Sequence, residues 1–156
     1  MSKPEWDEAE TAASNARVIL PWLANQYFEQ GRKLLAKKHN AANLHRFRLK
    51  TKRLRYTLEL FREVCGPSLE RWLELLRPLQ TALGEINDCA STLKLVDTRL
   101  HRDRKKLRPF LEKRSAKKAA EFEEYWRTTF DAPGRHKAWV DYLSRSPRPS
   151  RREASS

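Results

Sequence analysis

Positive charge is concentrated in one short stretch of this sequence, residues 45–55. Six Lys or Arg residues and one His fall within these eleven residues, and no carboxylate is among them. On a helix, like charges three or four residues apart repel each other by about 0.2–0.5 kcal/mol per pair. A helix optimised for stability alone would carry acidic residues between the basic ones. We therefore expect an external polyanion to supply the missing negative charge.

On a helix, one set of apolar residues in this stretch falls on one side and the basic residues on others. At about 100° per residue, four apolar residues fall within roughly 60° of one another, which makes a stripe wide enough to bury. These residues are Phe47, Leu54, Leu58 and Phe61. The opposite side carries a line of polar residues, His45, Arg48, Lys52, Arg55 and Glu59. A second basic row, Arg46, Lys50 and Arg53, is separated from the first by Leu49, Tyr56 and Leu60. This pattern indicates a helix that contacts protein on two sides.

The types of basic side chain predict different roles in binding phosphate. An Arg grips two phosphate oxygens at once, whereas a Lys acts as a point charge. We therefore expect Arg48 and Arg55 to set the geometry and Lys52 mainly to add strength. His45 adds a donor that can become cationic near neutral pH; alternatively, it packs or caps the helix beside Asn43. The alternative for the basic residues is an ordinary solvated helix face.

Polar residues in the next apolar segment are candidates for supporting roles. Gln80, Asn87 and Asp88 lie inside or beside an apolar pattern. They either form interhelical hydrogen bonds that orient basic side chains or are simply exposed. In the first case, Asp88 would hold one Arg in place. Tyr56, next to Arg55, is expected to pack between helices rather than to contact a ligand.

The wider apolar pattern predicts an all-α fold. No window alternates with a period of two, and apolar residues recur at three- and four-residue steps. We expect an antiparallel bundle of about four long helices plus a short C-terminal helix. The expected helices span about 16–38, 43–65, 67–100, 109–130 and 139–143. Pro78 should bend the third helix, and Gly84 should permit either close approach of a neighbouring helix or a break.

One helical domain is expected over residues 14–145. Residues 1–13 are expected to form a flexible leader, and Ser14 or Asn15 to cap the first helix. Asn43 is the expected cap of the second helix. Residues 146–156, rich in Ser, Pro and Arg, are expected to form a disordered basic tail.

The composition narrows the class of partner. The 156 residues carry 33 Lys and Arg against 20 Asp and Glu, a net charge of +13. Such a charge favours nucleic acid, anionic lipid headgroups or polymeric phosphate as the partner. We find no signal peptide and no run approaching the roughly 20 apolar residues of a membrane-spanning helix. The expectation is therefore a cytoplasmic protein without membrane insertion.

No pattern in the chain predicts catalysis. The four His are far apart, and the sequence has no Gly-rich phosphate loop and no clustered metal ligands. An acidic patch at Glu121, Glu123 and Glu124 is typical of a solvated helix face. Cys65 and Cys89 have no partner at metal-ligand spacing and are expected to be reduced structural residues. We expect no enzyme activity, metal or cofactor.

The chain resembles the conserved histidine α-helical domain family, known as CHAD, in two motifs. The first is His45-x-x-Arg48-x-x-x-Lys52-Arg53-Leu54-Arg55-Tyr56-x-Leu58-Glu59-Leu60-Phe61. The second is Leu79-Gln80-x-x-Leu83-Gly84-x-x-Asn87-Asp88. Both match in order and spacing, and the likeness covers about residues 15–145. Arg46 departs from the pattern, because an acidic or polar residue is common at that position.

This resemblance implies an all-helical fold whose basic surface binds inorganic polyphosphate, and some members of the family are found at polyphosphate granules. It places the polyphosphate-binding positions at His45, Arg48, Lys52, Arg53 and Arg55. We expect these to be supported by Lys50, Tyr56, Gln80 and Asp88. Members generally have two helical repeats, whereas this chain has one copy of the motif. The single copy suggests the hypothesis that two chains form a homodimer about a twofold axis.

Three other functions remain as alternatives to polyphosphate binding. A nucleic-acid-binding protein would need exposed aromatic residues between the basic ones, and here the aromatic residues fall mostly on apolar stripes. A helical scaffold that recruits a partner protein would bind neither polymer. A weak phosphohydrolase would release phosphate only with added Mg²⁺ and a required carboxylate.

Overall fold

The structure, a computed structural model, describes residues 2–145, and this part of the chain is helical without strands. Its elements are α1 (Ala12–Ala36), α2 (Ala41–Leu60), α3 (Arg62–Cys65), α4 (Leu69–Arg99), α5 (Arg104–Tyr125), the π-helical turn η1 (Trp126–Phe130) and α6 (Arg135–Ser144). The four long helices and the short C-terminal helix confirm the predicted all-α bundle.

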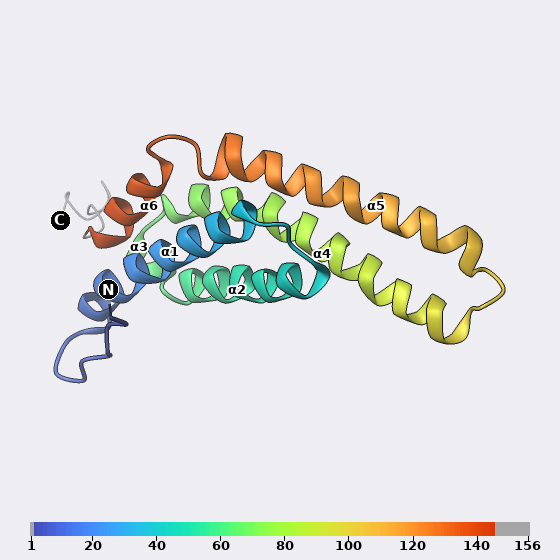
Figure 1. The fold of residues 1–156 in the computed structure, drawn as a ribbon. Helices are drawn as coiled ribbons and strands as arrows, with labels where there is room; N and C mark the ends of the chain where they lie inside the picture. The colour runs from blue at the N-terminus through green and yellow to red at the C-terminus, as the bar shows by residue number, and fades with distance from the viewer. Residues whose placement is uncertain (1, 146–156) are drawn as a thin grey trace.

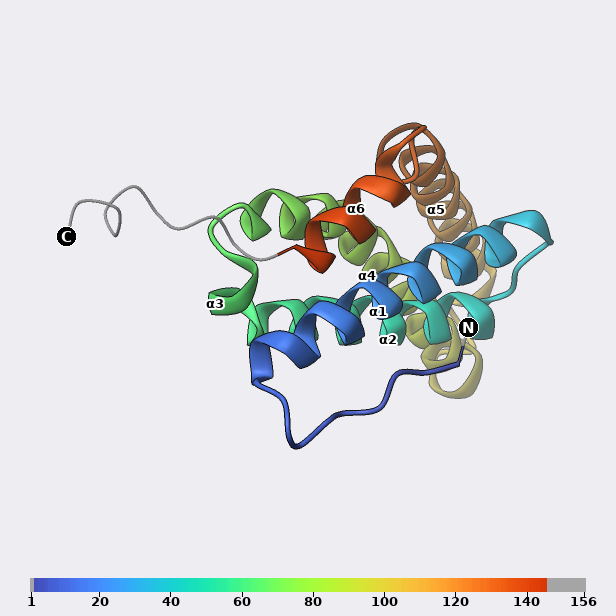
Figure 2. The same ribbon diagram turned by 90° about the vertical axis from the view of Figure 1, so that its left-hand side faces the viewer.

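The bundle consists of a long helical hairpin and the helices packed beside it. The long helices α4 and α5 pack against each other as a hairpin, and α2 packs against α4. The α1 helix lies between α2 and α6 (Figures 1 and 2). The far half of the α4–α5 hairpin extends beyond α1 and α2 (Figure 1). The amphipathic helix α2 is therefore held between α1 on one flank and α4 on the other.

Aromatic residues from distant parts of the chain form the centre of the core. Tyr27 of α1 stacks on Phe47 of α2 with ring centroids 4.8 Å apart, and Trp126 packs edge-on to the same Phe47 ring at 5.7 Å. Gly31 makes room for Trp126, because a Cβ at this position would lie 2.1 Å from the indole ring. The predicted burial of the α2 stripe is confirmed for Phe47, Leu54 and Leu58, and Phe61 is partly buried.

A buried hydrogen-bond chain holds α2 in a single rotation about its axis. The Thr51 hydroxyl donates to the Phe47 carbonyl at 2.9 Å, so its oxygen accepts from the Tyr27 hydroxyl at 2.7 Å. Both side chains are almost fully buried, and burial raises the pKa of the Tyr27 phenol. Since a buried hydroxyl without a partner costs free energy, this contact disfavours other rotations of α2.

The beginning of α1 and of α2 differs from the prediction. Thr11 caps α1 by accepting from the Ser14 amide at 3.1 Å, so the helix begins four residues before the predicted start at Ala16. Asn15 instead exchanges two hydrogen bonds with the Asp7 backbone, at 2.8 and 2.9 Å, which tie the leader to α1. Asn40, and not Asn43, caps α2.

The remaining helix ends were also predicted imprecisely. The α2 helix ends at Leu60, and residues up to Cys65 form the separate turn α3. The α4 helix continues through Gly84 without a break, and α5 begins before Pro109. A turn precedes α6, and Gly134 in this turn adopts a φ of 83°, which favours glycine. Gly84 and Pro109 therefore did not mark helix ends, because packing overrides local propensity.

The predicted disordered tail, residues 146–156, lies outside the described residues. The flexibility of the leader stays a prediction. The leader contacts α1 through the hydrogen bond between Asp7 and Asn15. It also contacts the end of α2, where the rings of Trp6 and Phe61 lie 6.4 Å apart. Among the helices of the described part, none has the length and apolar character needed to cross a membrane.

Candidate functional site

The two ends of the first basic row of α2 are bound to α4. His45 Nδ1 lies 2.7 Å from Asn87 Oδ1, and Arg55 Nη1 donates to Gln80 Oε1 at 2.6 Å. The pairing of the earlier α2 residue with the later α4 residue shows that the two helices run antiparallel. The row of His45, Arg48, Lys52 and Arg55, called here the α4-flank row, thus follows the edge of α4.

The outermost face of α2 carries apolar residues instead. Leu49, Tyr56 and Leu60 are 50%, 52% and 78% exposed. Arg48, Lys52 and Arg55 are partly buried. The prediction that the basic row lies opposite the buried stripe is therefore wrong in detail. The row lies at the side, because α4 packs against that flank of the helix.

Open space adjoins the middle of this row. Gly84 lies four residues after Gln80 and three before Asn87, on the same face of α4. A Cβ built at Gly84 would meet no atom within 4 Å. Neither predicted role for Gly84, close helix approach or a break, is observed. Since Gln80 and Asn87 contact the two ends of the α4-flank row, the space at Gly84 faces its central residues.

The central residues of the row have no acidic partner. Within residues 2–145, neither Arg48 nor Lys52 forms an ion pair, and the buried Arg48 Nε makes no hydrogen bond. The Arg55 Nε likewise makes no hydrogen bond, but Glu59 lies 3.5 Å from it and the Arg55 guanidinium lies 4.7 Å from the Tyr56 ring centroid. The two central cations therefore lack the acidic partner that Arg55 has in Glu59.

The α2 helix and most of α4 lie in the part of the chain that matches a known family. The CHAD domain family model matches residues 2–97, which include both the α4-flank row and its partners on α4. The chain belongs to the CHAD domain family. No curated protein and no solved structure matches it. In this CHAD domain, α5, η1 and α6 lie beyond the matched residues, yet they supply buried core side chains such as Phe122 and Trp139.

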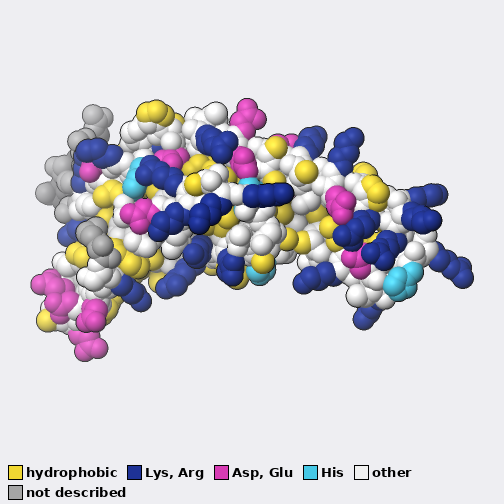
Figure 3. All heavy atoms as spheres, in the orientation of Figure 1, with side chains coloured by type: hydrophobic (Ala, Val, Ile, Leu, Met, Phe, Trp, Pro, Cys, Tyr) yellow, Lys and Arg dark blue, Asp and Glu magenta, His cyan; other side chains and the backbone are white. Residues whose placement is uncertain are grey.

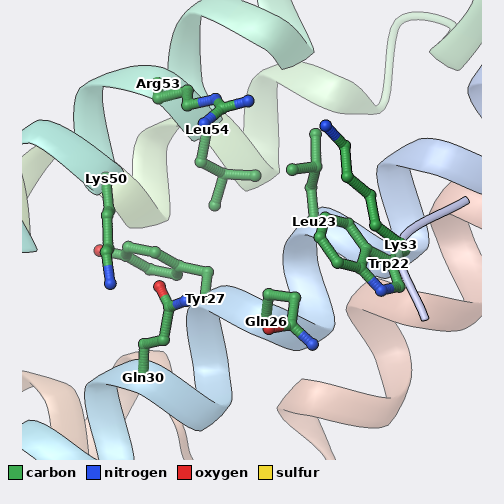
Figure 4. Close-up of a pocket in the computed structure, with 9 residues that line it drawn as sticks. All are labelled: Lys3, Trp22, Leu23, Gln26, Tyr27, Gln30, Lys50, Arg53 and Leu54. Atoms are coloured by element: carbon green, nitrogen blue, oxygen red, sulfur yellow. The ribbon is translucent and has the colours of Figure 1, made fainter. Parts of the chain in front are cut away.

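The other predicted site residues of this CHAD domain lie elsewhere. Lys50 and Arg53 are on the opposite flank of α2, beside α1, where they line a pocket with Tyr27 (Figure 4). Tyr56 does not pack between helices; its half-exposed ring lies beside the Arg55 guanidinium. The five predicted binding residues are thus divided between two sides of one helix.

Among the predicted supporting residues, Gln80 forms an interhelical hydrogen bond, which was one of its two predicted alternatives, and Asp88 does not. Asp88 lines a pocket on another side of α4 with Phe110 and Arg114. Within the described residues it forms no hydrogen bond or ion pair with α2. Asn87, its neighbour, makes the contact to His45 instead.

Sequence reasoning missed three lysines at the end of α1. Lys33, Lys37 and Lys38 line a pocket together with Arg46 and Lys50 of α2. On the helix expected over residues 16–38, the four-residue step from Lys33 to Lys37 predicts that both lie on one face, which was the available signal. In the structure α1 ends at Ala36, and Lys37 follows it in an extended conformation. The interhelical spacing that brings them to α2 is not visible in either segment alone.

Cys65 and Cys89 are both free cysteines in the structure. Cys89 packs with Val96 and Leu111, as expected for a structural residue. Burial raises the pKa of the Cys65 thiol. No group of three or more His, Cys, Asp or Glu side chains in residues 2–145 is placed to hold a metal ion.

Proposed function

We propose that this CHAD domain binds inorganic polyphosphate along the α4-flank row without catalysing its breakdown. The observation that carries the proposal is the pair Arg48 and Lys52, two adjacent cations without acidic partners beside the open space at Gly84. The CHAD family is associated with polyphosphate binding, which agrees with this site. A linear polyanion fits a row of cations along a helix better than a compact anion does.

The physical basis of binding is electrostatic and multivalent. Each cation that meets a phosphate releases condensed counterions, so the affinity should fall steeply with salt. Linked phosphates engage several cations together, so the affinity should rise with the length of the chain. We expect His45 and Arg55 to mark the ends of the row, because their contacts to α4 hold them in place.

A binding titration with polyphosphate of graded length tests the proposal. Changing Arg48→Ala together with Lys52→Ala should weaken binding by more than about tenfold and leave the helical circular dichroism unchanged, because neither side chain forms an ion pair. The matched control removes two exposed cations from the α4–α5 hairpin, Lys105→Ala with Lys113→Ala. An equal loss in the control would show a general charge effect. An equal loss for Arg148→Ala with Arg151→Ala would move the site to the tail.

Nucleic-acid binding is the second candidate, because the half-exposed Tyr56 ring lies beside Arg55 and could stack on a base. Competition separates the two polymers. At equal phosphate concentration and moderate salt, we expect RNA and DNA to leave long-chain polyphosphate bound. Displacement by either nucleic acid would reverse the ranking. A domain that bound neither polymer would be a scaffold for a partner protein.

The proposal has two further parts. The domain does not break down polyphosphate, and in cells it locates to polyphosphate granules. Polyphosphate incubated with the protein and Mg²⁺ should release no phosphate above the buffer control. Release that disappeared on mutation of a carboxylate would contradict a pure binding role. In cells, a fluorescent fusion of the full chain should gather at granules, and the Arg48→Ala, Lys52→Ala variant should remain diffuse.

A further inference from the structure

A second basic surface lies on the other flank of α2, between α2 and α1. It consists of two adjoining pockets that share Gln30 and Lys50. One has a volume of about 190 Å³ and carries Lys3, Lys50 and Arg53 around it (Figure 4). The other, of about 310 Å³, is lined by Lys33, Lys37, Lys38, His39 and Arg46 as well as Lys50. Together they form one continuous surface, called here the α1-flank groove.

In the described part of the chain, the Lys and Arg side chains of the groove have no acidic partner. No carboxylate lines either pocket. Within residues 2–145, none of its Lys and Arg side chains forms an ion pair, and Arg46 contacts only the neutral amide of Asn43. At one end of the groove, the carboxylate of Glu123 lies 3.4 Å from His39. Figure 3 shows Lys and Arg side chains gathered over α1 and α2.

In the α4–α5 hairpin, by contrast, several basic side chains form ion pairs. Asp97 pairs with both Arg104 and Arg108, at 3.2 and 2.7 Å. Glu85 lies 3.2 Å from Lys118 on the facing helix. The chain therefore places acids next to many of its basic residues in that region and places none in the α1-flank groove. Because unpaired like charges destabilise a folded protein, an external anion is the natural counterpart of this groove.

The shape of the groove favours a chain of linked phosphates. Along α2 alone, Arg46 and Arg53 are separated by about 10 Å at 1.5 Å per residue. A single phosphate could reach few of these cations, whereas a chain can engage them in succession. Tyr27 offers a base little stacking surface, because its ring is 3% exposed and stacks on Phe47. Trp22, which is partly exposed and lines the same pocket as Lys3, is the aromatic residue of the groove on which a base can stack.

We propose that the α1-flank groove is a second polyphosphate-binding site, so that α2 binds phosphate chains on both of its flanks. The identity of the polymer rests on the proposed function, and the existence of a separate site rests on the groove. Leu49, Tyr56 and Leu60 form the exposed strip between the two sites. A short chain can occupy either flank, and one domain therefore binds two short chains.

Calorimetric titration with a short polyphosphate of defined length measures this stoichiometry. The groove variant is Lys33→Ala, Lys37→Ala, Lys50→Ala, three exposed residues without ion pairs in the described chain. The row variant is Arg48→Ala, Lys52→Ala. The matched control is Lys105→Ala, Lys113→Ala, Lys117→Ala on the hairpin. We expect two chains per wild-type or control protein and one per groove or row variant, with unchanged circular dichroism in each.

The outcomes separate the two proposals. A groove variant that binds as many chains as the wild type overturns the second site and leaves the α4-flank row in place. A wild-type protein that binds no polyphosphate overturns the proposed function, and the polyphosphate site in the groove with it. Tripolyphosphate and ATP are then compared as competitors for the groove in the row variant. Stronger competition by ATP would show recognition of a nucleoside and overturn the assignment to a bare phosphate chain.

Discussion

His45 of α2 and Asn87 of α4 are 42 residues apart in sequence, and their side chains meet with Nδ1 and Oδ1 2.7 Å apart. This contact joins the two motifs of the CHAD family likeness, one on each helix. A second contact, from Arg55 to Gln80, joins them at the other end. The second motif therefore acts on the first by holding the ends of a basic row whose centre has no acidic partner.

Asn87 and Gln80 are expected to position the row without contributing charge. Changing Asn87→Ala with Gln80→Ala should weaken polyphosphate binding by about threefold, because the freed His45 and Arg55 must be ordered on binding. The dependence of log affinity on log salt should keep its slope. By comparison, Arg48→Ala should make that slope shallower by about one. A shallower slope in the Asn87 and Gln80 variant would contradict a purely positioning role.

Gly31 and Gly84 are expected to respond oppositely to substitution by alanine. At Gly31, the new methyl group would lie 2.1 Å from the Trp126 ring, so Gly31→Ala should lower the free energy of unfolding by about 1–3 kcal/mol or more. At Gly84, the methyl group meets no atom within 4 Å, so Gly84→Ala should raise the free energy of unfolding by about 0.5–1 kcal/mol. Urea denaturation measures both. Similar changes at both sites would contradict the packing of Trp126 against α1.

The stability of the fold should depend on His136 below neutral pH. Burial and the nearby Arg32 lower the pKa of His136 below its ordinary value of 6.5, although Asp131 and Glu29 act in the other direction. The unfolded chain then binds the proton more readily than the folded one. The contribution to stability is therefore present above pH 6.5 and is lost as the pH falls through 6.5 towards the folded value.

Thermal unfolding at about pH 7.5 and about pH 5.5 measures this effect. The wild type should lose more stability on acidification than His136→Gln, which keeps a donor for the Asn25 side chain that His136 Nε2 contacts at 2.8 Å. Parallel losses in the two proteins would assign the acid sensitivity to other groups.

The homodimer hypothesis predicts that the exposed strip of α2 becomes buried. Leu49, Tyr56 and Leu60 are its apolar residues, and the basic residues beside them should prevent association until a polyanion neutralises them. Light scattering should then give a dimer mass with polyphosphate, and Leu49→Glu with Leu60→Glu should prevent it. A monomer mass with and without polyphosphate would remove the hypothesis.

The local pattern of α2 could be predicted from its residues because helix phase depends only on sequence spacing. Phe47, Leu54 and Leu58 fall on one side whatever the helix packs against, and they are buried. Helix ends were harder, since Gly84 and Pro109 lie inside helices that tertiary packing stabilises beyond their local propensity. Likewise, the leader's attachment through Asn15 depends on an Asp7 contact that spacing does not indicate.

By itself the sequence determined an all-α fold, membership in a recognisable family pattern, and a helix with basic residues in two rows. Tertiary structure decided which row faces which neighbour. Because α4 packs on one flank of α2 and α1 on the other, Arg48 and Lys52 lie beside Gly84, while Lys50 and Arg53 join lysines of α1. The spacing along one helix sets the angles between its side chains, but only the packing of other helices sets what those side chains meet.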